Sequence, residues 1–177
     1  MYEPREDSFL LRKHVERIAK GEVLDVGTGS GILAEAASRN AEWVLATDIS
    51  LSSLFFAKKG GVRAKNIAFL CSDLFSSIQN VLFDVIIFNP PYLPNDNNVR
   101  DIALDGGAEG YELIERFLKK AKFFLKSNGI ILIVFSSLTK KDKVDWVIRR
   151  EGYCYELLDK KKLDFEELYV YKINYLY

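Results

Sequence analysis

Residues 22–38 read EVLDVGTGSGILAEAAS, and this stretch decides the fold. A short run with two valines and a leucine leads into a glycine-rich loop, and an alanine-rich segment follows. The run predicts a buried strand over 22–26, and the alanine-rich segment predicts a helix over 30–38. A glycine loop between a strand and a helix is typical of α/β domains, which bind ligands beyond the carboxyl ends of their strands.

The same alternation continues along the chain. Further strands are expected at 43–47, 67–71, 83–88, 130–135, 154–158 and 168–173, and further helices at 8–19, 51–59, 111–126 and 140–150. This order predicts a mostly parallel sheet with helices on both faces. The last two strands have no helix between them, so they should pair as an antiparallel hairpin around a charged turn at 159–162. We therefore expect an α/β, Rossmann-like fold with seven strands in a single domain spanning 1–177.

Composition excludes several classes of protein. The 177 residues contain 25 Lys and Arg against 25 Asp and Glu, so the basic excess of a dedicated nucleic-acid binder is missing. Cys71 and Cys154 lack metal-ligand spacing and are expected to be reduced core thiols. His14, the one histidine, is expected on a solvated helix face, and Trp146 in the core. We predict no metal site, no membrane span and no signal peptide, hence a cytoplasmic protein.

The glycine loop has the spacing G-x-G-x-G, formed by Gly27, Gly29 and Gly31. A nicotinamide-binding loop would read G-x-G-x-x-G. Asp25 precedes the first glycine by two residues, and its carboxylate would repel a pyrophosphate but attract an ammonium group. A purely structural strand-to-helix turn is the alternative interpretation of this loop.

Two further acids end the next two expected strands. Asp48 can accept both hydroxyls of an unphosphorylated ribose, although it could equally cap the helix that starts near Leu51. Asp73 can accept from an adenine amino group, with Leu74 or Phe75 against the ring, although a plain loop aspartate is an equal alternative. Asp25, Asp48 and Asp73 together favour an adenosine ligand without phosphates, which predicts S-adenosylmethionine.

Asn89-Pro90-Pro91-Tyr92 follows the expected strand 83–88. The nitrogen of an amide or exocyclic amino group is a poor nucleophile, because its lone pair is delocalised. The Asn89 side-chain carbonyl and the Pro90 main-chain carbonyl can hold such an NH₂ group in line with a sulfonium methyl group. The two prolines fix the backbone, and Tyr92 can stack on the flat substrate group. We predict Asn89, Pro90 and Tyr92 as catalytic, Asn89, Pro91 and Tyr92 as substrate-binding, and Asn89 as a cofactor contact as well.

These motifs resemble the HemK-like N5-glutamine methyltransferases, in particular the short archaeal and eukaryotic branch that acts on class I translation release factors. The likeness covers almost the whole chain. It includes Tyr2–Leu11, similar to the family's opening Y-E-P-x-E-D-[ST]-F-L-L, and Ala103–Gly110, similar to its A-x-x-G-G-x-x-G segment. Arg5 stands where the family usually has a small residue.

The resemblance implies a class I S-adenosylmethionine-dependent fold and a substrate, the glutamine of the Gly-Gly-Gln loop in the archaeal-type release factor. It also implies that residues 1–20 form a lid segment and helix over the cofactor, with Ser8 near the methionine end. Bacterial relatives carry an extra helical domain before the catalytic one, which this chain is expected to lack.

The resemblance further implies a small zinc-binding activator protein that adds a strand to the sheet edge at 67–71. This segment is apolar and uncharged, and a bare apolar edge strand promotes aggregation unless something covers it. A nearby loop could cover it instead.

Two other functions remain open at this point. The first is an adenine or guanine amino-methyltransferase acting on RNA or DNA, for which the basic cluster of Lys160, Lys161, Lys162, Arg149 and Arg150 is small. The second is a non-catalytic cofactor-binding subunit, against which the intact Asn89–Tyr92 motif argues.

Overall fold

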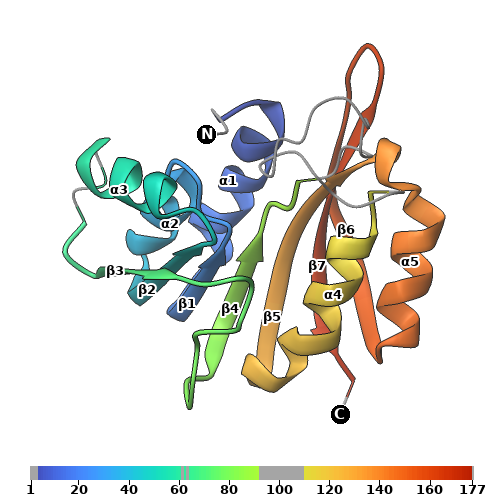
Figure 1. Ribbon diagram of the computed structural model, residues 1–177. Coiled ribbons are helices and arrows are strands. Elements are labelled where there is room, and N and C mark those ends of the chain that lie inside the picture. Colours follow the sequence, from blue (N-terminus) through green and yellow to red (C-terminus); the bar gives the residue numbers. More distant parts are fainter. Residues whose placement is uncertain (1–3, 61, 63, 92–109, 177) are drawn as a thin grey trace.

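The computed structural model describes residues 4–60, 62, 64–91 and 110–176 (Figure 1). Tyr92, the opening residues Tyr2 and Glu3, and nearly all of the Ala103–Gly110 segment lie outside the described residues. The elements are α1 (Glu6–Ile18), β1 (Gly21–Val26), α2 (Ile32–Ser38), β2 (Ala41–Asp48), α3 (Leu51–Gly60), β3 (Ile67–Cys71), β4 (Phe83–Phe88), α4 (Glu112–Ala121), η1 (Lys122–Phe124), β5 (Leu125–Ser136), η2 (Ser137–Thr139), α5 (Lys141–Arg150), β6 (Tyr153–Lys162) and β7 (Glu167–Tyr175).

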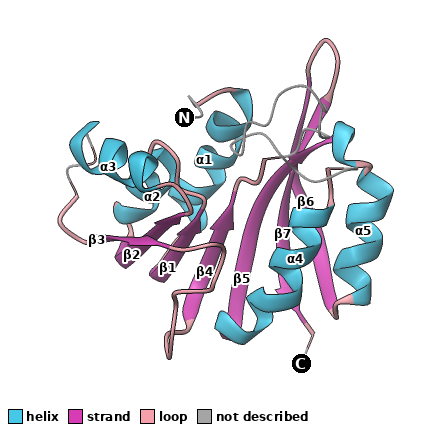
Figure 2. Ribbon diagram, viewed as in Figure 1, coloured by secondary structure: helices cyan, strands magenta, loops and turns pink. Residues whose placement is uncertain are grey.

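The strands form one twisted sheet in the order β3-β2-β1-β4-β5-β7-β6 (Figure 2). Pairing is parallel from β3 through β5, and β7 is antiparallel to both β5 and β6. This confirms the predicted α/β fold with seven strands and a closing hairpin. The strand order reverses between β1 and β4, so the loops that follow these two strands border the crevice where such sheets bind ligands.

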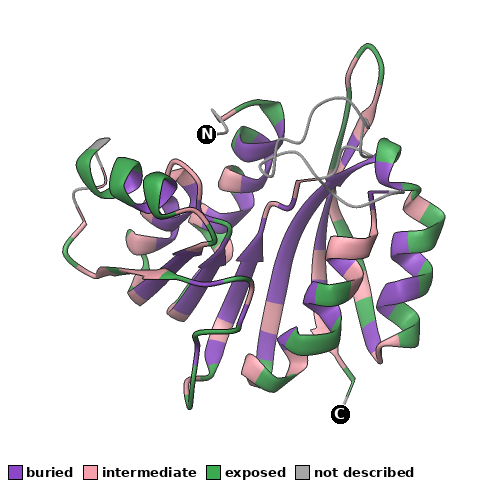
Figure 3. Cartoon of the chain, viewed as in Figure 1, coloured by how far each residue is buried: buried purple, intermediate pink, exposed green. Residues whose placement is uncertain are grey.

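Two apolar layers cover the two faces of the sheet. Leu11 and Val15 of α1 and Leu33 of α2 pack on one face, whereas Phe117 of α4 and Ile148 of α5 pack on the other. Successive strand residues alternate between these layers, as the pleat of a strand requires. The central strands are buried along most of their length (Figure 3), which explains their apolar sequences.

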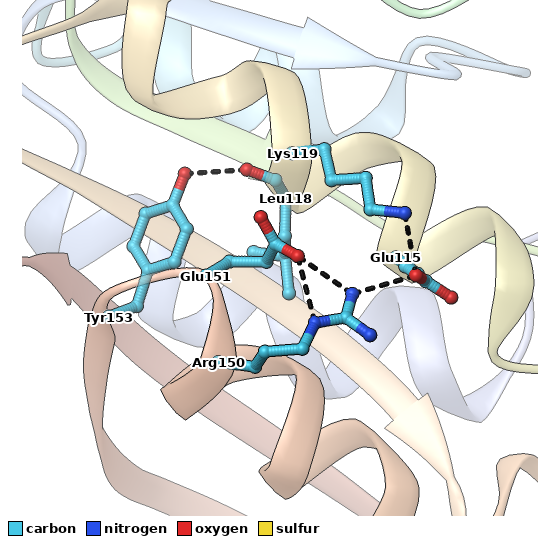
Figure 4. A network of polar contacts seen from close by, with 6 residues as sticks. All are labelled: Glu115, Leu118, Lys119, Arg150, Glu151 and Tyr153. Atoms are coloured by element: carbon cyan, nitrogen blue, oxygen red, sulfur yellow. Dashed lines mark hydrogen bonds and ion pairs between the residues drawn. The ribbon is translucent and has the colours of Figure 1, made fainter.

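A polar network joins α4 to the end of α5 (Figure 4). Arg150 donates to Glu115 at 2.7 Å and to Glu151 at 2.7 Å, and Lys119 pairs with Glu115. The Tyr153 hydroxyl donates to the main-chain oxygen of Leu118 at 2.8 Å. These contacts hold α4 against the end of α5 and the start of β6.

Several local predictions are wrong in their bounds. The segment 159–162 is not a turn but the end of β6, and the hairpin turn lies at 163–166. The strand predicted at 130–135 already begins at Leu125, with an irregularity where Phe83 pairs with Leu125 but Val85 with Ile130. The helix predicted to reach 126 ends at Ala121 and continues as a 3₁₀ turn. The extended hairpin projects beyond the sheet beside the start of α1 (Figure 1).

Three side chains differ from expectation in their burial. His14 is buried rather than solvated, because its ring nitrogen lies 3.1 Å from the Asp159 carboxylate of β6. Trp146 is exposed rather than core, and the Arg150 guanidinium lies over its ring. Cys71 and Cys154 are free but exposed, so they are not core thiols. No helix among the described residues is long and apolar enough to cross a membrane.

Candidate functional site

A cavity of about 780 Å³ opens at the carboxyl ends of β1, β2, β3 and β4. It is lined by the start of α1, by the loops after these strands, by α4 and by the β6–β7 hairpin: Arg5, Glu6, Asp7, Ser8, Val26, Gly27, Thr28, Gly29, Ser30, Ile32, Leu33, Asp48, Ile49, Ser50, Ser52, Ser53, Ser72, Asp73, Leu74, Phe88, Asn89, Pro90, Pro91, Leu113, Arg116, Leu163, Glu166 and Leu168. The structure therefore brings Ser8, Gly27, Gly29, Asp48, Asp73, Leu74, Asn89, Pro90 and Pro91 together, as the sequence predicts.

The three loop glycines do different work. All three have positive φ, at +69°, +53° and +83° for Gly27, Gly29 and Gly31. A Cβ at Gly27 or Gly29 would meet no atom closer than 4.0 Å, and both residues line the cavity. A Cβ at Gly31 would lie 2.7 Å from Val62 and 3.1 Å from Ala57 of α3. Gly31 is not among the residues that line the cavity, its surroundings indicate a packing role, and its predicted cofactor contact stays a prediction.

Asp25 also lies beneath the loop rather than in the cavity wall. It is fully buried, and its Oδ2 accepts a hydrogen bond from the Thr28 hydroxyl at 2.7 Å, while Oδ1 has no partner among the described residues. Burial raises the pKa of Asp25 to about 7, although the Thr28 hydroxyl acts in the opposite direction. The electrostatic attraction of Asp25 for a bound ammonium group would act across the loop. A direct contact between Asp25 and the cofactor stays a prediction.

Asp48 lines the cavity and also bonds the main chain just before α3, so its two predicted roles, ribose acceptor and helix cap, are compatible. Its Oδ1 accepts from the main-chain N–H of Ser50 at 2.8 Å, before α3, and its Oδ2 accepts from that of Gly29 at 2.9 Å. Each carboxylate oxygen has a second lone pair, so the group can still accept from ribose hydroxyls. The hydrogen bond to Gly29 ties the ends of β1 and β2 together, which sets the width of this part of the cavity.

The part of the cavity after β2 and β3 is lined by apolar side chains and bordered by charged ones. Leu74 adopts a positive φ of 50°, and the Ser72 hydroxyl donates to its main-chain oxygen. Ile49, exposed and next to Asp48, forms the opposite part of the wall. Phe75 belongs to the buried core, so of the two predicted adenine neighbours only Leu74 lines the cavity. Asp73 accepts from Arg116 of α4 at 3.0 Å, a rim partner that the sequence did not reveal.

Asn89 stands at the reversal of strand order, directly after β4. Its Nδ2 donates to the Ser8 hydroxyl oxygen at 3.1 Å and approaches Asp7 Oδ2 at 3.4 Å. Its Oδ1 is buried and has no hydrogen-bond partner among the described residues. A buried acceptor without a donor is costly, so this oxygen fits a ligand that supplies an N–H group. Beneath it, the buried Phe88 ring stacks on Phe117 with centroids 4.2 Å apart.

Sequence reasoning missed part of this lining, namely Asp7, Ile49, Leu113, Arg116, Leu163, Glu166 and Leu168. Asp7 could have been found from the sequence, because it lies next to Ser8 in the opening motif. Leu163, Glu166 and Leu168 come from the hairpin, where no local pattern marks a functional residue. Their position depends on the pairing of β7 with β5, which brings Leu168 opposite Ser136.

The lining suits a positively charged adenosine cofactor. Among the described lining residues, five are acidic (Glu6, Asp7, Asp48, Asp73 and Glu166) and two are basic (Arg5 and Arg116). Arg116 is already paired with Asp73. A nucleotide phosphate would face this acidic excess, whereas the sulfonium and ammonium groups of S-adenosylmethionine would be attracted by it.

Comparisons with known proteins agree with this chemistry. Residues 6–162 match the methyltransferase small domain family. A protein from Methanocaldococcus jannaschii that is provisionally named a protein N5-glutamine methyltransferase is 36% identical, over 96% of this chain and 89% of that protein. A release factor glutamine methyltransferase from Shewanella oneidensis is 32% identical over 73% of this chain, and the match spans 51% of that bacterial protein.

A solved structure matches the whole fold. It is the E. cuniculi Mtq2–Trm112 complex, described as responsible for methylation of the translation termination factor eRF1. The superposition has a TM-score of 0.81 and 27% sequence identity, and it covers 99% of this chain and 98% of the matched one.

Proposed function

The chain belongs to the methyltransferase small domain family, and from that membership we propose that it is an S-adenosylmethionine-dependent protein N5-glutamine methyltransferase. The observation that carries the proposal is Asn89 Oδ1, which is buried, has no hydrogen-bond partner among the described residues and belongs to a residue that lines the cavity. This oxygen is an acceptor for one N–H of a glutamine side chain, and the Pro90 main-chain oxygen is the expected acceptor for the other. Two acceptors in fixed positions favour a pyramidal nitrogen and hold it for transfer.

The remaining residues bind the cofactor and shape the pocket. The bound S-adenosylmethionine supplies an electrophilic methyl group. Asp48 would hold the ribose hydroxyls, Asp73 and Leu74 the adenine, and the main chain at Gly27 and Gly29 the methionine part. The Ser8 hydroxyl uses a lone pair to accept from Asn89, so its own hydrogen remains available to the cofactor carboxylate. Tyr92 is proposed to stack on the substrate amide.

The proposed substrate is the glutamine of the Gly-Gly-Gln loop in a class I release factor. Support comes from the names of the Shewanella oneidensis relative and of the Mtq2 complex, and from the opening motif. Nucleic acid is a weaker candidate, because the basic cluster is largely paired. Lys161 pairs with Glu6, Lys160 with Glu167, and Arg150 with Glu115 and Glu151.

Mass spectrometry tests this proposal directly. The purified chain, S-adenosylmethionine and an archaeal-type release factor should give a gain of one methyl group on the Gly-Gly-Gln glutamine. An Asn89→Ala variant should still bind cofactor and lose at least about 100-fold in rate, as when a polar contact to the reacting group is removed. Methyl groups found only in parallel samples of tRNA or DNA would contradict the proposal.

We also propose a small zinc-binding activator as a partner at β3. In the part of the chain that the structure describes, β3 pairs only with β2, so one of its edges is open. Ile49, Leu51, Phe55 and Phe56 form an exposed apolar surface at and beside α3, the helix that contacts β3. Mtq2, the matched structure, was solved with a partner chain, Trm112.

Binding of a Trm112-like protein can be measured with paired variants. Phe55→Lys places a charge in the exposed apolar surface and should weaken binding at least about 10-fold, because interface centres tolerate charge poorly. Phe123→Lys is the matched control, since Phe123 is equally exposed on η1, away from β3. Equal binding by both variants would place the partner elsewhere.

A further inference from the structure

Two buried side chains at the start of α1 hold one end of the Asn89 amide. Asn89 Nδ2 lies 3.1 Å from Ser8 Oγ and 3.4 Å from Asp7 Oδ2, although Asp7 and Asn89 are 82 positions apart. Asp7 and Ser8 are only 2% and 3% exposed. These contacts therefore belong to the packed interior and not to a solvated surface.

The other end of the same amide, Oδ1, accepts no hydrogen bond from the described residues. Asn89 Oδ1 is buried, lacks a hydrogen-bond partner among the described residues, and belongs to a residue that lines the cavity. The amide thus has its donor end on α1, and in the proposed function its acceptor end receives an N–H of the substrate glutamine. A rotation by 180° about the last side-chain bond would exchange the two ends with almost no change in shape.

Ser8 and Asp7 differ in what they require of this amide. A serine hydroxyl can donate or accept, so Ser8 would bond either end of the amide. An ionised aspartate only accepts, so the rotated amide would bring its oxygen within about the same distance of a carboxylate oxygen and be repelled. Of these two residues, Asp7 is the one that distinguishes the two orientations of the amide.

We propose that Asp7 is a positioning residue that fixes the orientation of the Asn89 amide and thereby makes the site select a substrate NH₂ group over a carboxylate. The inference rests on the proposed function, because it concerns the glutamine that Asn89 receives. The opening segment then does more than border the cofactor, since it determines the hydrogen-bonding polarity of the catalytic asparagine.

The test compares two substitutions of Asp7 with a matched control. Asp7→Asn keeps the shape but can present either end of its own amide, and Asp7→Leu removes the acceptor altogether. Asp142→Asn is the control, because Asp142 also lies in the first turn of a helix but is exposed and away from the cavity. Cofactor affinity and thermal unfolding of each variant show whether it is folded.

We expect Asp7→Leu to lower kcat about 10- to 100-fold, as substitutions that disturb the orientation of a functional ligand do. Asp7→Asn should cause a smaller loss, and in both variants cofactor affinity should fall by a smaller factor than kcat. A second measurement is the ratio of two binding affinities, that for the release factor and that for a version of it with glutamate at the methylated position. This preference for glutamine should narrow in the Asp7 variants, because a rotated Asn89 amide donates to a carboxylate, whereas a merely structural defect would weaken both ligands equally.

Three results would overturn the inference. The first is an unchanged kcat in both Asp7 variants, and the second is an unchanged ratio of the affinities for the glutamine and glutamate versions. The third is that Asp7→Leu lowers kcat by the same factor in the Asn89→Ala background as in the original chain. Failure of the proposed function would look different, because the unaltered chain would then methylate no glutamine at all. Binding of the two release-factor versions can be measured in either case.

Discussion

Asp25 shows how a single buried carboxylate can weaken the fold at neutral pH. The group is fully buried, one of its oxygens has no partner among the described residues, and its pKa is raised from 3.8 to about 7. A buried carboxylate costs free energy when it is charged. Residues of this kind are kept at functional sites in spite of that cost.

Between about pH 4 and pH 7, folded Asp25 binds its proton more tightly than unfolded Asp25 does. The free energy of unfolding therefore falls as pH rises through this window, and the loss is complete above about pH 7. Asp25→Asn cannot ionise, so its stability relative to the original chain should rise across the same window. A shift of about three pKa units sets the gain at no more than on the order of 4 kcal/mol.

Urea unfolding at pH 4.5 and pH 8, values chosen to bracket this window, measures the effect of Asp25→Asn. Asp84→Asn is a control that should show almost no pH dependence in this range. Burial acts to raise the pKa of Asp84, but hydrogen bonds from Lys126 and from the Glu22 main chain outweigh it and lower the pKa. Its substitution should therefore cost nearly the same stability at pH 8 and at pH 4.5, because both values lie above the ordinary pKa of 3.8. A stability gain for Asp25→Asn that does not grow with pH would contradict the prediction.

At the scale of elements, the glycines in the loop between β1 and α2 have two roles. One lines the cavity and another allows close packing of two helices. Gly29 is open toward the cavity, whereas Gly31 holds the N-terminal end of α2 in contact with α3. Both have positive φ, so an alanine is strained at either position. What differs is the neighbour that the new methyl group would meet.

Gly31→Ala should lower the free energy of unfolding by about 2–4 kcal/mol, from backbone strain together with overpacking against Ala57 and Val62. Gly29→Ala should cost only the strain, about 1 kcal/mol, but weaken cofactor binding at least about 10-fold, because its methyl group enters the cavity. Calorimetry of unfolding and of cofactor binding on the pair separates the two roles. The prediction is wrong if the two variants lose stability equally.

The elements also show where local sequence is sufficient. β3 and β4 have their predicted bounds because both are short apolar runs that end in polar residues. β6 was placed too short, since Asp159 to Lys162 is a highly charged stretch that suggests a turn. In the structure it remains a strand, because it pairs with β7 and because Asp159 and Lys161 pair with His14 and Glu6 of α1. Partners so distant in sequence leave no local pattern.

At the scale of the whole molecule, the cavity joins parts of the chain that are far apart in sequence. Hydrogen bonds connect the strand ends around it, from Thr28 N to Thr47 O at 2.8 Å and from Ser72 N to Asp48 O at 3.0 Å. A ligand in this cavity contacts loops from four strands together with α1. Its binding should consequently stabilise the entire domain.

Cofactor at about 100 times its dissociation constant should add about 2.7 kcal/mol to the free energy of unfolding. For a chain of this length that corresponds to a rise in Tm of about 5–10 °C. Asp48→Asn should lose most of this rise at the same cofactor concentration, because one hydrogen bond to a charged acceptor is worth about 1.5–3 kcal/mol. Asp84→Asn, at the opposite end of the sheet, should keep it, and differential scanning fluorimetry with and without cofactor compares the two.

The sequence by itself determined the order of strands and helices, the glycine loop, the acids at three strand ends and the Asn89–Tyr92 motif. Each of these depends on residues close together in the chain, so periodicity and spacing reveal them. Only the tertiary structure decided that Asp25 and Gly31 lie behind the cavity wall, that His14 is buried, and that Asp7 reaches Asn89. The physical reason is that burial and hydrogen-bond polarity depend on neighbours supplied by distant segments, and these neighbours exist only once the sheet has brought the segments together.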